Sequence, residues 1–430
     1  MKVIRNPKRT EWPDILGRPG QDVSDIEPIV RSILQRVKLE GDVAVRELTN
    51  ELDNVDVPSP VVERVEIDLA SARVPSELRD AIDIAASNIK KFHESQIGET
   101  RVIETMPGVR CWRKSVPIEK VGLYIPGGTA PLFSTVLMLA IPARIAGCSE
   151  VVLCTPPNAR GEIHDAVLYA AELCGVKRVF KIGGAQAIAA MAYGTESVPR
   201  VDKIFGPGNR FVTLAKQLVS TEIAIDLPAG PSELAILADD SCEPSFVAAD
   251  LLSQAEHGPD SQVILVSNDE GTVERVAAEV KRQLNDLPRR AIAEESLRNS
   301  RSIVVDDTTV GIDLINFYAP EHLILAVKNA DAVADRIVNA GSVFIGNYAP
   351  ESVGDYASGT NHTLPTAGFA RSMSGVSLDS FVKKITFQKL EADGLRRLGP
   401  HVECMAKAEE LDAHARAISI RMEALNGQKN

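Results

Sequence analysis

The chain has 430 residues, of which 44% are hydrophobic and 25% charged, a composition typical of a globular protein with two or three domains. Its formal net charge of −12 and the lack of a Lys/Arg run exclude a general nucleic-acid binder, which needs a basic face to neutralise phosphates. Six cysteines without a CxxC pair, and an N-terminus without an apolar signal segment, indicate a cytoplasmic protein with reduced thiols.

The N-terminal quarter is predicted to be mostly helical. Residues 1–23 are polar and contain prolines, which favours an arm that packs on another part of the protein. In residues 24–52 and 77–94 apolar side chains recur at steps of three and four, the pattern of a helix with one buried face. Short strands are expected at 110–117 and 120–125.

Strands and helices then alternate as far as residue 219, which predicts a parallel sheet with helices on both faces. The most apolar stretch, residues 132–146, is too short to cross a bilayer, so we expect no membrane segment. Three of the strand-to-helix turns are glycine-rich: Pro126–Thr129, Gly183–Gln186 and Gly206–Asn209. Such turns let backbone N–H groups approach a phosphate, but none matches GxGxxG with an acid downstream. The spacing alone therefore indicates only that nucleotide or phosphate binding is possible.

A second series of strand-like runs begins at Ser232 and continues to residue 346, which predicts a second sheet of comparable size. From about Asp379 to the C-terminus the pattern is helical.

Four polar segments carry histidines with further chemistry-bearing residues. Gln254 and His257 stand three apart near the predicted end of a helix, so they share one face, as a metal site requires. A histidine that only caps the C-terminus of its helix explains the same pattern. Glu321 and His322 stand where a strand begins and offer two proton-transfer groups, although an exposed polar loop fits this tetrapeptide equally well.

The other two segments lie further along the chain. Asp355 and His362 are expected in a Gly- and Ser-rich loop after a strand, a usual place for sites in α/β proteins, or in an ordinary turn. Glu409 and His414 are five apart, so on one regular helix they cannot share a ligand face. They either touch opposite ends of a small molecule or form a solvated pair. The Gln, Asp and His types suit zinc better than calcium or an iron–sulfur cluster.

Together these segments closely resemble the histidinol dehydrogenase family over nearly the whole length of the chain. The matching blocks, in the family's order, are Gly183–Ala190, Gly206–Asn209, Asp226–Glu233, Leu251–Gly258, Tyr318–Leu323 and Ala357–His362. So many blocks in one order make chance agreement implausible, and they favour the functional interpretation of each motif over its structural alternative.

The resemblance implies the roles of individual residues. Zinc is expected to be held by Gln254, His257, Asp355 and, from the partner subunit, His414. Glu321 and His322 match the family's acid–base pair. Further substrate contacts, alongside His322 and the four metal ligands, are expected from Ser232, His362 and Glu409, and NAD contacts are expected from Tyr124, Gln186 and Asn209.

The resemblance also implies the fold, the assembly and the reaction. We expect an α/β protein with two Rossmann-like parallel-sheet domains, smaller helical N- and C-terminal segments, and an intertwined homodimer that shares its sites between subunits. The expected parts are an arm (1–23), a first α/β domain (24–123 with 234–378), an NAD-contacting second domain (124–233), and a helical tail that reaches the partner (379–430). The expected reaction is the oxidation of L-histidinol to L-histidine through L-histidinaldehyde with two NAD⁺.

Two other enzyme functions fit the same residues. The first is that of a relative that keeps the metal site but oxidises another polyol or a sulfonated alcohol. The second is that of a zinc-dependent hydrolase, which would use Glu321 and His322 on bound water. NADH formation separates a dehydrogenase from a hydrolase. A non-catalytic nucleotide-binding module has no use for so many clustered ionisable groups.

Overall fold

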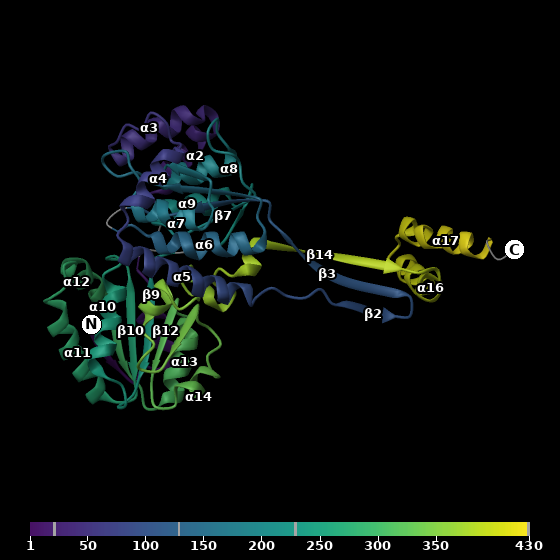
Figure 1. The fold of residues 1–430 in the computed structure, drawn as a ribbon. Coiled ribbons are helices and arrows are strands. Elements are labelled where there is room, and N and C mark those ends of the chain that lie inside the picture. Colours follow the sequence, from purple (N-terminus) through teal and green to yellow (C-terminus); the bar gives the residue numbers. More distant parts are fainter. Residues whose placement is uncertain (20–22, 128–129, 228–229, 428–430) are drawn as a thin grey trace. The chain divides into compact units, whose positions relative to one another are not determined.

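The computed structural model describes residues 1–19, 23–127, 130–227 and 230–427, and it divides the chain into two compact units (Figure 1). The first unit comprises residues 1–96 and 118–381, and the second comprises residues 97–117 and 382–430. The first unit is built on two parallel sheets with helices on both faces, and the second on an antiparallel sheet and two helices. The α/β class predicted from the sequence is confirmed.

The first parallel sheet has five strands in the order β6-β5-β4-β7-β8. In chain order the strands are β4 (Lys120–Tyr124), β5 (Glu150–Thr155), β6 (Arg178–Lys181), β7 (Lys203–Phe205) and β8 (Ala224–Ile225). Every neighbouring pair is parallel. Numbered from β4, the order is 3-2-1-4-5, in which the chain leaves the first strand toward one edge and later returns to its other side.

Helices cover both faces of this sheet, which explains why its strands are apolar on both sides. Alternate residues of one strand face opposite layers, so Leu123 and Tyr124 belong to different cores. Full burial of a side chain such as Leu123 stabilises the fold by about 1.5–3 kcal/mol. The layer on the Leu123 side contains α4 (Arg64–Arg73), α5 (Ser76–Glu94), α6 (Phe133–Ala146) and α7 (Asp165–Leu173). The opposite layer contains α2 (Glu27–Glu40), α3 (Asp42–Asp53), α8 (Gly184–Tyr193) and α9 (Arg210–Val219).

The second parallel sheet has six strands in the order β1-β11-β10-β9-β12-β13. They are β1 (Lys2–Arg5), β9 (Glu233–Ala238), β10 (Gln262–Ser267), β11 (Arg301–Val304), β12 (His322–Ala326) and β13 (Ser342–Ile345). If β1 is set aside, the order numbered from β9 is again 3-2-1-4-5. The two sheets therefore share one winding pattern.

Helices also sandwich the six-stranded sheet. Figure 1 shows α10 (Pro244–Ala255), α11 (Glu270–Leu284) and α12 (Arg290–Asn299) on one face, where they share a core with the sheet. The other face carries α1 (Trp12–Ile15), α13 (Thr308–Tyr318) and α14 (Ala330–Ala334). The remaining helices of this unit are α15 (Glu351–Tyr356) and the 3-10 turns η1 (Arg9–Glu11), η2 (Phe369–Arg371) and η3 (Leu378–Phe381).

The second unit pairs distant parts of the sequence. Its sheet has the order β14-β3-β2, with β2 (Val102–Met106), β3 (Val109–Pro117) and β14 (Val382–Leu390) antiparallel to their neighbours. Trp112 of β3 stacks on Phe387 of β14 with ring centroids 5.4 Å apart. The helices α16 (Ala392–Ala408) and α17 (Asp412–Gly427) follow β14 and pack on each other.

The N-terminal arm packs on another part of the protein, as predicted: residues 2–5 form edge strand β1, and Trp12 is buried in the core of the six-stranded sheet. Two other expectations about the parts of the chain differ from the structure. Helices α2 to α5 pack on the five-stranded sheet instead of joining residues 234–378. The tail starts with the nine-residue strand β14, whose partner β3 is far away in the sequence and invisible to a local pattern. No helix within the described ranges is both long and apolar enough to cross a membrane.

Candidate active site

The predicted acid–base residues lie where strand β12 begins, at the amino end of the six-stranded sheet. Helix α13 ends at Tyr318, Ala319 turns the chain with a φ of 54°, and β12 starts at His322. Glu321 and His322 are only 6% and 3% exposed, so the alternative of an exposed polar loop is wrong. The carboxylate Oε2 of Glu321 accepts a hydrogen bond of 2.8 Å from the backbone N–H of Glu233, where the neighbouring strand β9 begins.

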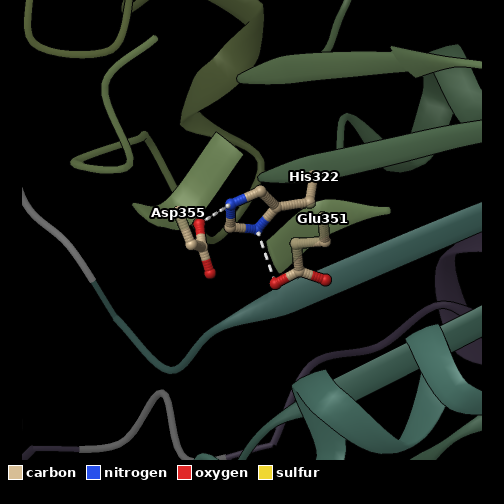
Figure 2. Close-up of side chains that lie close together, drawn as sticks. All are labelled: His322, Glu351 and Asp355. Atoms are coloured by element: carbon tan, nitrogen blue, oxygen red, sulfur yellow. Dashed lines mark ion pairs between the residues drawn. The ribbon is translucent and has the colours of Figure 1, made fainter. Parts of the chain in front are cut away.

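Three carboxyl groups surround the ring of His322. Its Nδ1 lies 3.7 Å from Oε2 of Glu321 and 3.6 Å from Oε1 of Glu351, and its Nε2 lies 3.4 Å from Oδ1 of Asp355. Figure 2 shows the imidazole between Glu351 and Asp355, which are both on α15. These two acids are four residues apart, so one short helix presents both of them to the ring.

The charges in this cluster are strongly coupled. Burial alone would lower the pKa of His322, but the negative charges of Glu351, Glu321 and Asp355 outweigh it and raise the pKa to about 10. Burial raises the pKa of Glu321 to about 8 and that of Glu351 well above its usual range. Burial also opposes ionisation of Asp355, yet its contact with His322 holds the pKa of this carboxyl below its usual range. At neutral pH the charged pair is therefore His322 with Asp355, while Glu321 and Glu351 are largely protonated, and a further cation nearby would favour their ionised forms.

The predicted pair Gln254 and His257 is in contact. Gln254 is fully buried in the last turn of α10. This helix ends at Ala255, earlier than expected, so His257 lies just beyond it and not on the same helix face. Their side-chain atoms Nε2 and Nδ1 are 3.1 Å apart. Asp355 acts electrostatically on both His257 and His322, so it connects this pair to the cluster around His322.

His362 links the cluster to the layer of the five-stranded sheet. Its Nδ1 lies 2.8 Å from the backbone oxygen of Asp355, and its Nε2 lies 3.1 Å from the hydroxyl of Thr135 in α6. The neighbouring Asn361 donates a 2.6 Å hydrogen bond to the backbone oxygen of Met138 in the same helix. His362 is therefore fixed beside the first turns of α6.

The other predicted substrate residues lie in different places. Ser232 is half-buried directly before β9, next to the hydrogen bond that fixes Glu321. Glu409 directly follows α16 and His414 lies in the first turn of α17, and both are exposed in the second unit. Residues 409–411 separate the two helices, so the two side chains do not lie on one regular helix.

A separate pocket of about 690 Å³ lies at the carboxyl ends of β4, β5, β6 and β7. All three predicted NAD residues, Tyr124, Gln186 and Asn209, line it. The hydroxyl of Tyr124 accepts a 3.1 Å hydrogen bond from the N–H of Gly184, the first residue of α8, and burial raises the pKa of this phenol to about 12. Asn209 caps α9 through a 3.1 Å hydrogen bond from the N–H of Val212. Two helix starts therefore face the pocket wall, as a phosphate group requires.

Glycine is required where backbone segments meet beneath this pocket. Gly206 has a φ of +125°, and a Cβ there would collide with the backbone oxygen of Tyr124. The second predicted turn is also tight, since a Cβ on Gly183 would lie 2.6 Å from Cβ of Pro156. The turn Pro126–Thr129 lies partly outside the described residues, at 128 and 129, as do 228 and 229 of the block Asp226–Glu233.

Several buried polar atoms of the cluster are left without a hydrogen-bond partner among the described residues. They are Oε1 of Gln254, Oδ1 of Asp355, Oε2 of Glu351 and both ring nitrogens of His322. An unpaired buried polar atom costs about 1–3 kcal/mol, so such a group indicates a missing ligand. Nitrogen and oxygen donors of this kind fit zinc. Within the described chain, the ligand atoms of His322, Glu351 and Asp355 lie within 4.8 Å of one another, so this trio is a second possible cation site that shares Asp355.

Comparison with known proteins places this geometry in a family. The family model described as "Histidinol dehydrogenase" matches residues 16–422. The chain belongs to the histidinol dehydrogenase family. The histidinol dehydrogenase of Bacteroides fragilis (strain YCH46) is 57% identical over 426 residues, which cover 99% of this chain and 100% of that protein. That of Aliivibrio fischeri is 53% identical over 415 residues, covering 96% and 94%.

The fold is that of a solved member of the family. The crystal structure of histidinol dehydrogenase from Elizabethkingia anophelis superposes with a TM-score of 0.97 at 53% identity and covers 99% of both chains. The family and the dehydrogenase class predicted from the sequence are confirmed. The roles of single residues remain predictions.

Sequence reasoning missed Glu351. It is one of 59 acidic residues and stands in no recognisable motif. The available signal was its position directly after Pro350 and four residues before Asp355, which on a helix places both carboxyls on one face. Asp355 itself was expected in a loop, and the structure places it in α15.

Proposed function

We propose that this chain oxidises L-histidinol to L-histidine through L-histidinaldehyde, with one water consumed and two NAD⁺ reduced to two NADH. The buried pair Glu321–His322 beside Asp355, in a chain that belongs to the histidinol dehydrogenase family, is the observation that supports this best. We place the reaction in the cytoplasm, in keeping with six cysteines that form no disulfide.

We propose a zinc ion at Gln254, His257 and Asp355, completed by the partner subunit's His414. The unpaired Oε1 of Gln254 and Oδ1 of Asp355 are oxygen donors of the required type. Zinc bound there supplies a fixed positive charge that orients the amine and imidazole of the substrate and offsets the surrounding carboxylates.

His322 serves as general base in the first oxidation. It takes the proton of the alcohol oxygen while the adjacent carbon loses a hydride to NAD⁺, which leaves the aldehyde. Glu351 and Glu321 lie 3.6 and 3.7 Å from Nδ1 of this ring and stabilise its protonated form. Their charges help to raise the pKa of the ring to about 10, so the unprotonated ring that acts as base becomes more populated as the pH rises.

Glu321 serves in the second oxidation by taking a proton from the attacking water, which converts the aldehyde to its hydrate. The hydrate then loses a hydride to the second NAD⁺ and becomes the carboxylate of histidine. The bond from the N–H of Glu233 fixes one oxygen of Glu321 and leaves the other for this task. The whole conversion releases three protons with two NADH, so atoms and electrons balance.

The pocket at the five-stranded sheet is proposed to bind NAD through Tyr124, Gln186 and Asn209. At the start of α8 the N–H of Gly184 is bonded to Tyr124, and the backbone N–H groups that follow it are proposed to bind the pyrophosphate. Ser232, His362 and Glu409 are proposed to contact the substrate, with the ring of His362 held between Asp355 and Thr135.

Counting NADH tests the function directly. With limiting L-histidinol and excess NAD⁺, two NADH should form for each substrate molecule, and L-histidine should be the product. One NADH per molecule would indicate release of the aldehyde, and none would favour a hydrolase. Other polyols and sulfonated alcohols, assayed in parallel, should give no NADH.

Mixing two inactive variants tests the shared site. His322→Asn and His414→Ala each disable a different part of the site, so a homodimer of either has no complete one. In a hybrid dimer, one of the two sites receives both natural residues if the partner subunit's His414 is used. Activity should then reappear on mixing and subunit exchange, whereas a site built within one subunit would give none.

A further inference from the structure

Asp53, a residue without an assigned role, lines the same pocket as Tyr124 and Gln186. It is half-buried at the last position of α3, and Nε2 of Gln186 lies 3.4 Å from its Oδ2. Gln186 is only 1% exposed, and its Oε1 has no hydrogen-bond partner among the described residues. Two side chains that face one pocket thus keep hydrogen-bonding capacity for a ligand.

The position of Asp53 does not favour a stabilising role. A carboxylate at the C-terminal end of a helix opposes the helix dipole, because backbone oxygens point the same way. In the described chain no Lys or Arg pairs with Asp53, and burial alone raises its pKa. The nearby Asp56 at the same end of α3 differs, since it is exposed and forms an ion pair with Arg46 at 3.0 Å. The partly buried carboxylate of Asp53 therefore lowers the stability of the fold, and a ligand that donates hydrogen bonds to it can offset this loss.

The chemistry of the pocket selects among nucleotide ligands. None of its described lining residues is Lys or Arg, whereas two, Asp53 and Glu162, are acids. A ribose with free hydroxyls donates hydrogen bonds to a carboxylate, but a 2′-phosphate places a doubly negative group beside it. Without a cation nearby, that phosphate has no compensating partner.

We propose that Asp53, held by Gln186, binds the ribose diol of the dinucleotide and makes the pocket select NAD⁺ over NADP⁺. This inference rests on the proposed NAD-dependent function and names the residue that determines its coenzyme specificity. Asp53 comes from α3, outside the strand-to-helix turns where such an acid usually lies.

The test is the preference for NAD⁺ over NADP⁺ in kcat/KM, measured with L-histidinol on Asp53→Asn, Asp53→Ser and Asp53→Glu. Loss of a charged hydrogen-bond acceptor should lower this ratio by about tenfold or more in the Asn and Ser variants. Asp53→Glu keeps the charge and should retain the preference to within about threefold. The control Asp56→Asn removes an exposed acid from the same segment and should leave the ratio unchanged.

The ratio is insensitive to partial unfolding, because both coenzymes are measured on one preparation. For a variant that turns over slowly, equilibrium dialysis with NAD⁺ and with NADP⁺ gives the coenzyme preference as a ratio of dissociation constants. An unchanged ratio in Asp53→Asn and Asp53→Ser, or an equal fall in Asp56→Asn, would overturn the inference and leave the proposed function intact. If the unaltered protein forms no NADH from histidinol, the proposed function fails first, and the inference fails with it.

Discussion

The two parallel sheets share the strand order 3-2-1-4-5, yet the residues predicted to be functional gather at opposite ends. In the five-stranded sheet the pocket lies beyond the carboxyl ends of β4 to β7, among glycine-rich turns. In the six-stranded sheet Ser232 and Glu321 directly precede β9 and β12, at the amino ends of the strands. The first arrangement is the usual one for α/β folds, and the second departs from it.

The difference follows from what each ligand requires. A dinucleotide phosphate is held by helix starts, which in an α/β sheet stand after the carboxyl ends of strands. The proposed metal site needs side-chain donors instead, and these come from helix ends, as with Gln254 near the end of α10 and Asp355 near the end of α15. One winding pattern can therefore supply two kinds of site, depending on which end carries the polar residues.

The largest expected effect concerns the base at the amino end of β12. His322→Asn should lower kcat by about a thousandfold, since a positioned general base contributes on the order of 10²–10⁴. Zinc content should stay at the unaltered level, because His322 is not among the proposed ligands. Steady-state kinetics together with metal analysis of the purified variant measures both. Loss of zinc in proportion to loss of activity would contradict the assignment.

A smaller effect is expected from the proposed ligands at the end of α10. Gln254→Ala should weaken zinc affinity by roughly 10–100-fold, as removal of supporting donors does at other sites, and excess zinc should restore much of the activity. Titration of the chelated protein with zinc gives the affinity. His362→Asn serves as the comparison, because it changes a predicted substrate contact and should leave zinc affinity close to that of the unaltered protein.

Glu351 lies beside the ring of His322 and is not one of the predicted zinc ligands. Its negative charge is the largest of the influences that raise the pKa of His322, so Glu351→Gln should lower that pKa. NMR titration of the His322 ring in the zinc-free protein measures this shift. We expect kcat to fall about tenfold and KM for histidinol to change little. An unchanged ring titration would show that Glu351 does not act on His322.

The smallest effect concerns Asp250 of α10, which acts electrostatically on Glu351. Burial raises the pKa of Asp250 to about 7. The unfolded chain ionises this group near pH 4, so the folded state loses stability as the pH rises from there to about 7. Asp250→Asn removes this loss and should increase the free energy of unfolding by about 1–2 kcal/mol at pH 8, and by less at pH 5. Urea unfolding of both proteins at pH 8 and pH 5 measures this increase in the free energy of unfolding. An equal increase at the two pH values would exclude titration of Asp250 as the cause.

Local patterns predicted both parallel sheets, because their strands are short apolar runs that need no distant partner to be recognised. Val121 to Ile125 and Gln262 to Ser267 are examples. Strands β1 and β14 were missed, since Lys2–Arg5 and Val382–Leu390 mix charged and apolar residues without a clear alternation and become strands by pairing with β11 and β3. Their structure depends on long-range contacts that a local window does not contain.

The site was predictable to the extent that its residues stand in compact motifs. Gln254 with His257 and Glu321 with His322 are in contact or adjacent in the structure, as their spacing indicated. Glu351 and Asp53 were missed for a physical reason. Each is a single acid in a helix, and only the tertiary fold brings the first to His322 and the second to the pocket at the five-stranded sheet.

The position of the proposed metal ion between Gln254, His257 and Asp355 can be measured directly. Crystals of the zinc-loaded protein, measured at the zinc absorption edge, locate the ion by its anomalous scattering. We predict one peak for each subunit, within bonding distance of those three side chains and of the partner subunit's His414. A peak held by His322 and Glu351 instead, or no peak at either place, would contradict this prediction.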